Sequence, residues 1–443
     1  MVQDRSRLQT GFTGDITGIQ NHRPLKIGDV LTEGENLELA TQRWPEFTFH
    51  TSREYCGLRR PEPEGTMNDT LFAPGQPPRV LLLSGYDAAS HKRWRDQITG
   101  MFGDYHWQTL ALPPRFFRWR IRGNPLSWLN EPALQKHWDL VLATSMVDLA
   151  TLRSFHSQLA QTPCVLYMHE NQFVFPVSKK QRSSAEPQMV NLYSAISADS
   201  VVFNSAWNRD SFLDGAREFL DQMPDGVPDG LIARLREKSR VIPVPIEDRL
   251  FVSRAKAHNR DCPHLLWNHR WEYDKGPERL LKLLQALDQR GIPFRLSVVG
   301  ERFRNHPKAF DRIHEQFGDR IEQWGFLDSR EDYDRVLGQA DIVLSTALHD
   351  FQGLSMLEAM ASGCVPLAPD RLAYREYIPD QCRYESHEQD ADREAEAAAD
   401  CLEWLLQQKP ARCQPDAWRA SLLAGQYQSL FDQFLQTERS NPT

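Results

Sequence analysis

From Arg79 onward, short apolar runs of strand type alternate along the chain with longer stretches of helical pattern. This alternation is typical of parallel sheets covered by helices on both faces. A first set of expected strands comprises Val80–Ser84, Trp107–Leu112, Leu140–Ala143, Val165–Met168 and Ser200–Phe203. A second set comprises His264–Asn268, Arg295–Val299, Asp341–Ser345 and Val365–Ala368, with helices expected at 276–290, 306–317, 331–339 and 354–361. We therefore expect an α/β protein whose ligands bind beyond the carboxyl ends of the strands.

Changes in composition divide the chain into parts. Residues 1–77 are polar, contain few apolar runs and lead into the Pro-rich APGQPPR, so we expect an irregular N-terminal extension. A charged stretch at 247–262 is the expected linker between two α/β domains, 78–250 and 263–385. The tail, 386–443, is rich in Ala, Glu, Leu and Gln and is expected to be helical over 387–435, with a C-terminal helix that can return to the first domain.

The overall composition excludes several classes of protein. A net charge of −8 argues against a basic surface for nucleic acid over the whole protein, but it does not exclude a local basic patch. The seven cysteines are scattered without a CxxC pair, which predicts neither a metal site nor a disulfide framework and fits a reducing compartment. No apolar run approaches the roughly 18 residues of a membrane span. The first residues lack the apolar core of a signal peptide, so we expect a cytoplasmic protein.

The segment at 346–363 carries the strongest indication of chemistry. An apolar strand leads into a polar loop, and Gly353 then opens a helix that carries Glu358, with Asp350 in the loop before it. A glycine at a helix N-terminus lets an anion approach free backbone N–H groups, where the helix dipole favours negative charge. One carboxylate on each side of such a site can serve a sugar and a ribose flanking a diphosphate. The alternative is a capped surface helix with a solvated Glu358.

A second segment, 265–281, places two cations at a strand-to-helix turn. Arg270 lies just past the strand, and Lys275 lies just before Gly276, where the next helix begins. Two cations in this position can clamp a diphosphate and neutralise the charge that grows on a leaving group. The alternative is a pair of surface cations that form ion pairs with Glu272 and Asp274.

Two loops of the first domain are candidate substrate contacts. His169 and Glu170 follow directly after the strand that ends at Met168, where an imidazole can hydrogen-bond a sugar hydroxyl. Small residues up to Ser90 follow the first strand and permit backbone approach to a phosphate or sugar. Ser90 is equally a candidate helix N-cap, and a single histidine in a loop is often only structural.

These segments resemble the family-four retaining glycosyltransferases, which have two Rossmann-like domains facing each other across a cleft, the GT-B architecture. The family motif is Glu, seven residues, Glu, with a Phe-Gly or similar pair near its front. Here the first acid is Asp350, and Gln352 interrupts the pair. Arg270 and Lys275 match the two cations of the family, and a histidine in the place of His169 is a feature of the family.

The segment 113–128 is basic and aromatic. It carries four arginines interleaved with aromatic residues and no acidic residue: Arg115, Arg118, Arg120 and Arg122. Arginines neutralise phosphates, while aromatic rings and guanidinium planes stack on exposed bases. This segment is the best local candidate for RNA contact, the alternative being an amphipathic loop packed on the body of the protein.

Four segments narrow the resemblance to the tRNA-queuosine alpha-mannosyltransferase family: SGYDAASHKRW, LPPRFFRWRIRGNPLSW, YMHENQFVFPV and HDFQGLSMLEAMASGCVPLAPDRLAYREYIP. They occur in family order over roughly residues 79–380, so residues 1–77 lie outside the resemblance. The family transfers mannose from GDP-mannose to the cyclopentenediol of queuosine in the anticodon of tRNA-Asp. The resemblance therefore implies GDP-mannose as donor, tRNA as partner and no separate cofactor or metal. Two alternatives are the same chemistry on a glycan, lipid or small molecule, and a non-catalytic RNA-binding relic.

The resemblance also implies roles for the candidate residues. The helix from Gly353 adds backbone donors to the diphosphate site, Glu358 holds the ribose hydroxyls and Asp350 faces the sugar, while His169 contacts mannose from the other domain. A transition state like an oxocarbenium ion is expected, as in glycoside hydrolysis. No second carboxylate is clearly placed as a nucleophile, which favours front-face retention with the leaving phosphate as base.

Overall fold

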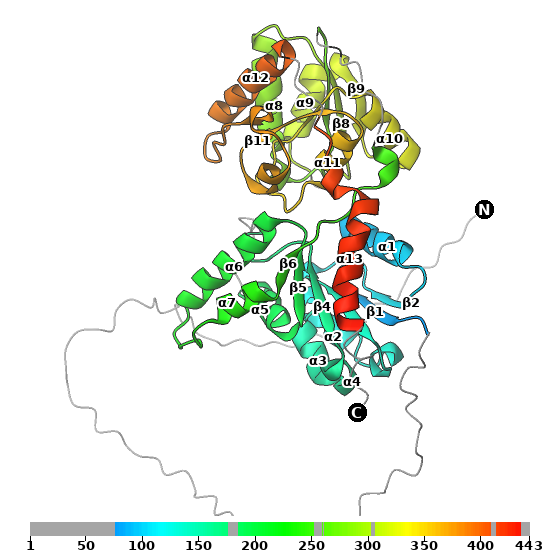
Figure 1. Ribbon diagram of the computed structural model, residues 1–443. Helices are drawn as coiled ribbons and strands as arrows, with labels where there is room; N and C mark the ends of the chain where they lie inside the picture. The colour runs from blue at the N-terminus through cyan, green and yellow to red at the C-terminus, as the bar shows by residue number, and fades with distance from the viewer. Residues whose placement is uncertain are drawn as a thin grey trace, which may run out of the picture. The chain divides into compact units, whose positions relative to one another are not determined.

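The computed structural model describes residues 76–175, 185–251, 259, 261–302, 306–408 and 413–435 (Figure 1). The polar extension expected over residues 1–77 lies, apart from its last two residues, outside this part of the chain. Among the described residues, no helix has the length and apolarity needed to cross a membrane.

Two parallel sheets form the cores of two lobes. The first has the strand order β2-β1-β3-β4-β5-β6 and the second β12-β11-β10-β7-β8-β9. The strands of the first sheet are β1 Arg79–Ser84, β2 His106–Ala111, β3 Leu140–Thr144, β4 Cys164–Met168, β5 Ser200–Phe203 and β6 Ser239–Val241. Those of the second are β7 His264–Trp267, β8 Arg295–Val299, β9 Ile321–Gly325, β10 Ile342–Leu344, β11 Val365–Pro369 and β12 Arg383–Tyr384.

Counted from β7, the second sheet has the order 3-2-1-4-5-6 of the Rossmann fold. The chain reverses direction across this sheet between β7 and β10, and across the first sheet between β1 and β3. Ligands of open α/β sheets bind at such switch points, beyond the carboxyl ends of the strands. The loops after β7 and β10 are those that carry Lys275 and Asp350.

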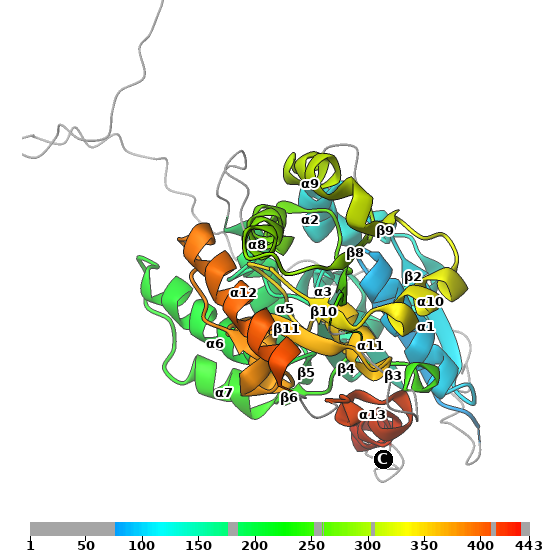
Figure 2. The same cartoon turned by 90° about the horizontal axis from the view of Figure 1, so that it is seen from above.

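Helices cover both sheets (Figures 1 and 2). In the first lobe they are α1 Ala89–Met101, α2 Phe117–Ser127, α3 Leu149–Phe155, α4 Ser157–Gln161, α5 Glu186–Ser197, α6 Ala206–Asp221 and α7 Leu231–Glu237. In the second lobe they are α8 Pro277–Gln289, α9 Ala309–Phe317, α10 Arg330–Gln339, α11 Leu354–Ala361 and α12 Ala391–Gln407, of which α8 and α12 lie side by side (Figure 2). The last helix, α13 Ala420–Leu435, returns to the first lobe, as we expected.

Neighbouring residues of β1 show how the first sheet is buried on both faces. Leu81 and Leu83 pack on one face with residues of α3, α5 and α6. Leu82 packs on the other face with Trp94 of α1 and Tyr427 of α13, and the Trp94 indole N–H donates to the Tyr427 hydroxyl at 2.9 Å. A strand buried on both faces consists of a continuous run of apolar residues. The sequence therefore predicted β1.

The nine expected strands are present within one or two residues, and three further strands were missed. β6 lies at one edge of the first sheet and has three residues, while β12 and β9 lie at the two edges of the second sheet; β12 has two residues, and most residues of β9 are partly exposed. Such strands lack the apolar run that identifies a buried strand. The tail, expected to be helical over 387–435, is interrupted between α12 and α13, where Asp416–Trp418 forms only a 3-10 turn.

Candidate functional site

Asp350 organises the loop between β10 and α11. Its Oδ1 accepts a hydrogen bond from the backbone N–H of Gly353 at 3.0 Å, and its Oδ2 accepts one from the Tyr374 hydroxyl at 3.2 Å. Gly353 has a φ of 76°, and a Cβ added there would lie 2.2 Å from the hydroxyl oxygen of Tyr377. The turn therefore requires glycine, and α11 begins directly after it with the positive end of its dipole toward the loop.

Lys275 lies beside this carboxylate. Its Nζ donates to the backbone carbonyl of His349 at 2.7 Å and lies 3.4 Å from Asp274 Oδ2 and 3.6 Å from Asp350 Oδ2. The residue is only 8% exposed, so the alternative of a surface cation does not hold for it. The structure thus brings together two of the residues that the sequence singled out, Lys275 and Asp350, at the switch point of the second sheet.

The electrostatics of this cluster follow from its burial. Burial raises the pKa of Asp350, but the charge of Lys275, the neighbouring His269 and His349 and the hydrogen bond from the Gly353 N–H together lower it more, so the pKa stays below its usual value. Burial also lowers the pKa of His269 to about 4, and burial together with Lys275 lowers that of His349 to about 4. Near neutral pH the site therefore combines a carboxylate, an ammonium group and two neutral imidazoles.

Arg270 is the exposed cation of the pair. Its side chain is 47% exposed, and its guanidinium lies 3.1 Å from Glu272, so the ion pair that we weighed as an alternative is present. The charge of Arg270 also lowers the pKa of Glu170 in the first lobe, although burial and His91 act on Glu170 more strongly. Arg270 is thus free to exchange Glu272 for a bound anion at modest cost, because exposed ion pairs contribute little.

Glu358 is buried on α11 and is held by three donors. Its Oε1 accepts hydrogen bonds from Arg93 of α1 at 2.6 Å and Arg330 of α10 at 2.8 Å, and its Oε2 accepts one from the Tyr333 hydroxyl at 2.9 Å. The side chain is 5% exposed, so the alternative of a solvated glutamate is wrong. Glu247, 3.6 Å from Arg330, adds a second carboxylate to the same network.

His169 and Glu170 lie at the carboxyl end of β4 with His91 of α1. The ring of His169 stacks on that of His91 with centroids 4.1 Å apart, and its buried Nε2 has no hydrogen-bond partner among the described residues. His91 Nε2 lies 2.9 Å from Glu170, which also accepts from the Ser145 hydroxyl at 2.8 Å. Burial lowers the pKa of His169 well below its usual value, and His91 lowers it further, so the ring is neutral.

Ser90 is not the N-cap of the first helix, which corrects that alternative. Helix α1 begins at Ala89, its N-cap is Ala88, and that cap makes no side-chain hydrogen bond. Ser90 lies inside the first turn with an exposed side chain. Its expected role in substrate binding stays a proposal.

Residues 117–127 of the basic segment form the helix α2 rather than a loop, and this helix packs on the body of the protein. Ile121 packs against Met146, which follows β3, and the ring of Phe117 lies 6.0 Å from that of Tyr86, which follows β1. Helix α2 therefore lies beside the switch point of the first sheet. Arg122 is 51% exposed and forms an ion pair with Asp148 at 2.6 Å, so an acid from another segment neutralises part of the basic run.

Comparison with known proteins agrees with this architecture. Residues 79–246 match the N-terminal family of tRNA-queuosine alpha-mannosyltransferases, and residues 248–416 match the glycosyl transferases of group 1. The chain is 31% identical over 315 residues to a tRNA-queuosine alpha-mannosyltransferase of Drosophila melanogaster, an alignment that covers 69% of this chain and 83% of the fly protein. The chain belongs to the tRNA-queuosine alpha-mannosyltransferase family. It is therefore an enzyme, a hexosyltransferase of the glycosyltransferase class.

Solved structures show the same fold at low identity. Sucrose-phosphate synthase of Thermosynechococcus elongatus aligns with a TM-score of 0.58 and 17% identity, covering 81% of this chain and 99% of that one. A glycosyltransferase of Rickettsia africae aligns with a TM-score of 0.57 and 14% identity, covering 81% and 99%. The expected fold class, two Rossmann-like domains of GT-B type, is thus confirmed for this member of the family.

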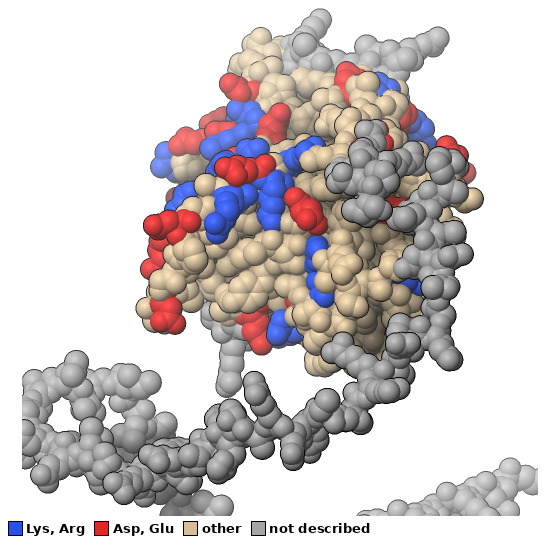
Figure 3. Space-filling view, turned by 60° about the horizontal axis from the view of Figure 1, so that its bottom comes forward, with Lys and Arg blue, Asp and Glu red and all other residues tan. Residues whose placement is uncertain are grey.

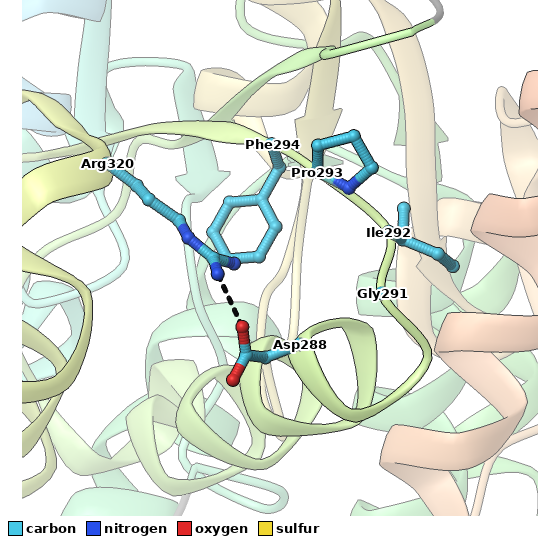
Figure 4. A pocket seen from close by; sticks show the side chains of 6 residues that line it. All are labelled: Asp288, Gly291, Ile292, Pro293, Phe294 and Arg320. Carbon is cyan, nitrogen blue, oxygen red and sulfur yellow. Dashed lines mark hydrogen bonds and ion pairs between the residues drawn. The ribbon is translucent and has the colours of Figure 1, made fainter.

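A surface hollow of about 200 Å³ lies away from the residues described above (Figure 4). It is lined by the end of α8 and by the segment that enters β8, at the amino end of the sheet. Arg320 spans it, forming an ion pair with Asp288 and lying 4.6 Å from the ring centroid of Phe294. Ligands of this fold bind at the opposite edge of the sheet, so this hollow is not a candidate active site for the family's reaction.

The residues that hold the candidate side chains in place are not recognisable from the sequence. Arg93 and Arg330 contact Glu358, and His91 contacts Glu170, but each pair is far apart in the chain. Arg93 and Glu358, for example, are separated by 265 positions. No motif in the sequence connects these residues, because they come together only when the chain folds.

Proposed function

We propose that this protein transfers mannose from GDP-mannose to the cyclopentenediol of queuosine in the anticodon of tRNA-Asp. The observation that carries the proposal is the charged switch point of the second sheet, where Lys275 lies 3.6 Å from Asp350 beside the start of α11. A buried cation next to a helix N-terminus suits the diphosphate of a nucleotide sugar. The name of the fly relative and the family of the first lobe support mannose as the sugar and queuosine in tRNA as the acceptor.

In this proposal Lys275 and Arg270 bind the diphosphate, and the first turn of α11 after Gly353 adds backbone N–H groups. Glu358 accepts hydrogen bonds from the ribose hydroxyls, which must share its carboxylate with the three donors that already hold it. A carboxylate has about four lone-pair directions, so one ribose hydroxyl can be added directly and a second must displace one of the three donors. Asp350 faces the sugar from the loop that it organises.

The first lobe supplies the acceptor side. The neutral imidazole of His169 can hydrogen-bond a mannose hydroxyl through the Nε2 that has no partner among the described residues. Glu170 and Ser90 contribute further substrate contacts. Arg115, Arg118, Arg120 and Arg122 contact tRNA phosphates from α2 and the loop before it.

The reaction breaks the bond between the anomeric carbon of mannose and the diphosphate oxygen. A hydroxyl oxygen of the cyclopentenediol forms the new bond on the same face, and its proton passes to the leaving diphosphate oxygen. The positive charges of Lys275 and Arg270 stabilise the negative charge that grows on this oxygen. Configuration is thus retained without a protein nucleophile, and no cofactor or metal is required beyond the donor.

Two measurements test the proposal. Purified protein should hydrolyse GDP-mannose slowly without acceptor, and should do so faster than UDP-glucose. Nucleosides from tRNA of cells with the gene should contain a queuosine heavier by one hexose, which should be missing from cells without the gene. Unchanged nucleosides in both cells, with donor hydrolysis intact, would move the acceptor to another molecule. We place the reaction in the cytoplasm, with tRNA as partner.

A further inference from the structure

Two exposed aromatic rings lie where the loop after β2 enters α2. Phe116 is 69% exposed and Trp119 is 55% exposed. Phe116 is the N-cap residue of α2, and its carbonyl accepts the backbone N–H of Trp119 at 2.9 Å. Both rings therefore stand at the start of the helix that packs beside the switch point of the first sheet.

Phe116 has a backbone conformation that residues other than Gly, Asn and Asp rarely adopt. Its φ is 56° and its ψ is 51°, the left-handed helical region. For a non-glycine residue this conformation is unfavourable, and such strain gathers at functional sites. The ring gains no compensating burial, because most of it is in contact with solvent. Instead, the guanidinium of Arg115 lies 5.6 Å from the ring centroid, as in a cation–π pair.

Trp119 rests on a glycine one helical turn further along the chain. A Cβ added to Gly123 would lie 2.5 Å from Cε2 of the indole, so the ring lies directly on the glycine backbone. Glycine inside a helix is less favourable than alanine. Here, however, its lack of a side chain lets the indole pack against the backbone, while Trp119 remains more than half exposed. A side chain fixed in this way loses little freedom when it binds a partner.

Positive charge accompanies both rings. Arg115, Arg118 and Arg122 are exposed on the same segment, and the segment itself contains no acidic residue. On the face of the molecule shown in Figure 3, Lys and Arg side chains are interspersed with Asp and Glu. Aromatic rings beside arginines suit unpaired nucleotides, because each base offers a flat face for stacking and a phosphate for the guanidinium group.

We propose that Phe116 and Trp119 form a stacking platform for the unpaired bases of an RNA loop. This inference rests on the proposed tRNA acceptor and adds how that acceptor is recognised. The arginines provide affinity for the phosphates, whereas the two rings discriminate an unpaired loop from a duplex, whose bases are already stacked. The platform requires no particular base sequence, because stacking is tolerant of base identity.

The test compares an RNA hairpin with an unpaired loop and a fully paired duplex of equal length, with binding measured by fluorescence anisotropy. The wild-type protein should prefer the hairpin. Phe116→Ala and Trp119→Ala should each weaken hairpin binding about tenfold and leave duplex binding and the salt dependence unchanged. Trp119→Phe should restore most of the lost affinity. Trp404→Ala, which removes an exposed indole from α12 in the other lobe, should have no effect.

Gly123→Ala separates the platform from helix stability. Alanine favours the helix more than glycine does. The added methyl group would, however, displace the Trp119 indole from its position against residue 123, so hairpin affinity should fall several-fold. Equal losses for hairpin and duplex, or wild-type hairpin affinity in the Phe116→Ala/Trp119→Ala protein, would overturn the platform. Binding of the wild-type protein to anionic lipid vesicles that the double variant loses, without a hairpin preference, would assign the rings to a membrane surface. Donor hydrolysis that persists in the double variant shows that a failure of the platform is not a failure of the proposed reaction.

Discussion

Replacing Lys275 by methionine should affect both catalysis and folding, and the two effects can be separated. The ammonium group is buried within 3.4 Å of Asp274 and 3.6 Å of Asp350, and it donates to a backbone carbonyl at 2.7 Å. Removing one partner of a buried ion pair costs about 3 to 5 kcal/mol, because the remaining charge is left uncompensated. Here two carboxylates are left, so the free energy of unfolding should fall by about that amount, a large part of the roughly 5 to 15 kcal/mol typical of a protein.

Turnover should fall separately by roughly 100 to 1000-fold, the usual effect of losing one preorganised charge donor. Urea denaturation gives the first quantity, and GDP-mannose hydrolysis per folded molecule gives the second. Lys282→Met, which removes a half-buried lysine of α8 that pairs with the exposed Asp392, should change the free energy of unfolding by less than about 1 kcal/mol. In Lys275→Met the added change Asp274→Asn should restore part of the lost stability but none of the turnover, because Asp350 keeps its charge. If it restores both, or if folded Lys275→Met retains normal turnover, the diphosphate role of Lys275 is wrong.

Three further predictions follow from the same geometry. Arg270→Ala should lower turnover roughly 100-fold with little change in the urea midpoint, because its side chain is 47% exposed; a large loss of stability with normal turnover would contradict this role. Glu358→Gln should weaken GDP binding about tenfold or more, the effect of removing a hydrogen bond to a charged group, and unchanged affinity in calorimetry would exclude the ribose role. Burial lowers the pKa of His269 and, together with Lys275, that of His349 to about 4, so the unfolded chain binds protons first as the pH falls. The free energy of unfolding should therefore be unaffected by these two histidines above about pH 6.5 and should fall towards pH 4, by about 3 kcal/mol for each histidine. Urea midpoints that stay level over this range would show that the two rings are not held neutral.

The fold was predictable from the sequence where burial is continuous. Strands such as Cys164–Met168 are covered on both faces, so every residue is apolar and the run is visible without any alignment. In the edge strand Ile321–Gly325 only Gly325 is buried and Glu322 is exposed, so this strand gave no such signal. The alternative of a helix cap at Ser90 is wrong for a local reason: the N-cap is Ala88, two residues earlier, and element boundaries depend on packing as much as on propensity.

For the candidate site, the sequence predicted the positions of the two loops but not the partners of their side chains. Gly353 and Gly276 mark turns that require a positive φ, and their place between a strand and a helix located the two loops. The side-chain partners were not predictable, because Arg93 reaches Glu358 from the other lobe. Likewise, nothing in the sequence indicated that Lys275 is buried between two carboxylates while Arg270, five positions earlier, is exposed.

The most direct test of the central claim is the transfer reaction with purified components. The protein is incubated with GDP-mannose and either tRNA-Asp that carries queuosine or the same tRNA with guanine in that position, and the nucleosides are analysed by mass spectrometry. We predict that queuosine gains one hexose with retained configuration, that the guanine-containing tRNA is unchanged, and that Asp350→Asn abolishes the gain. Equal modification of both tRNAs, or no modification of the queuosine-containing tRNA by protein that hydrolyses GDP-mannose, would contradict the assignment of queuosine as the acceptor.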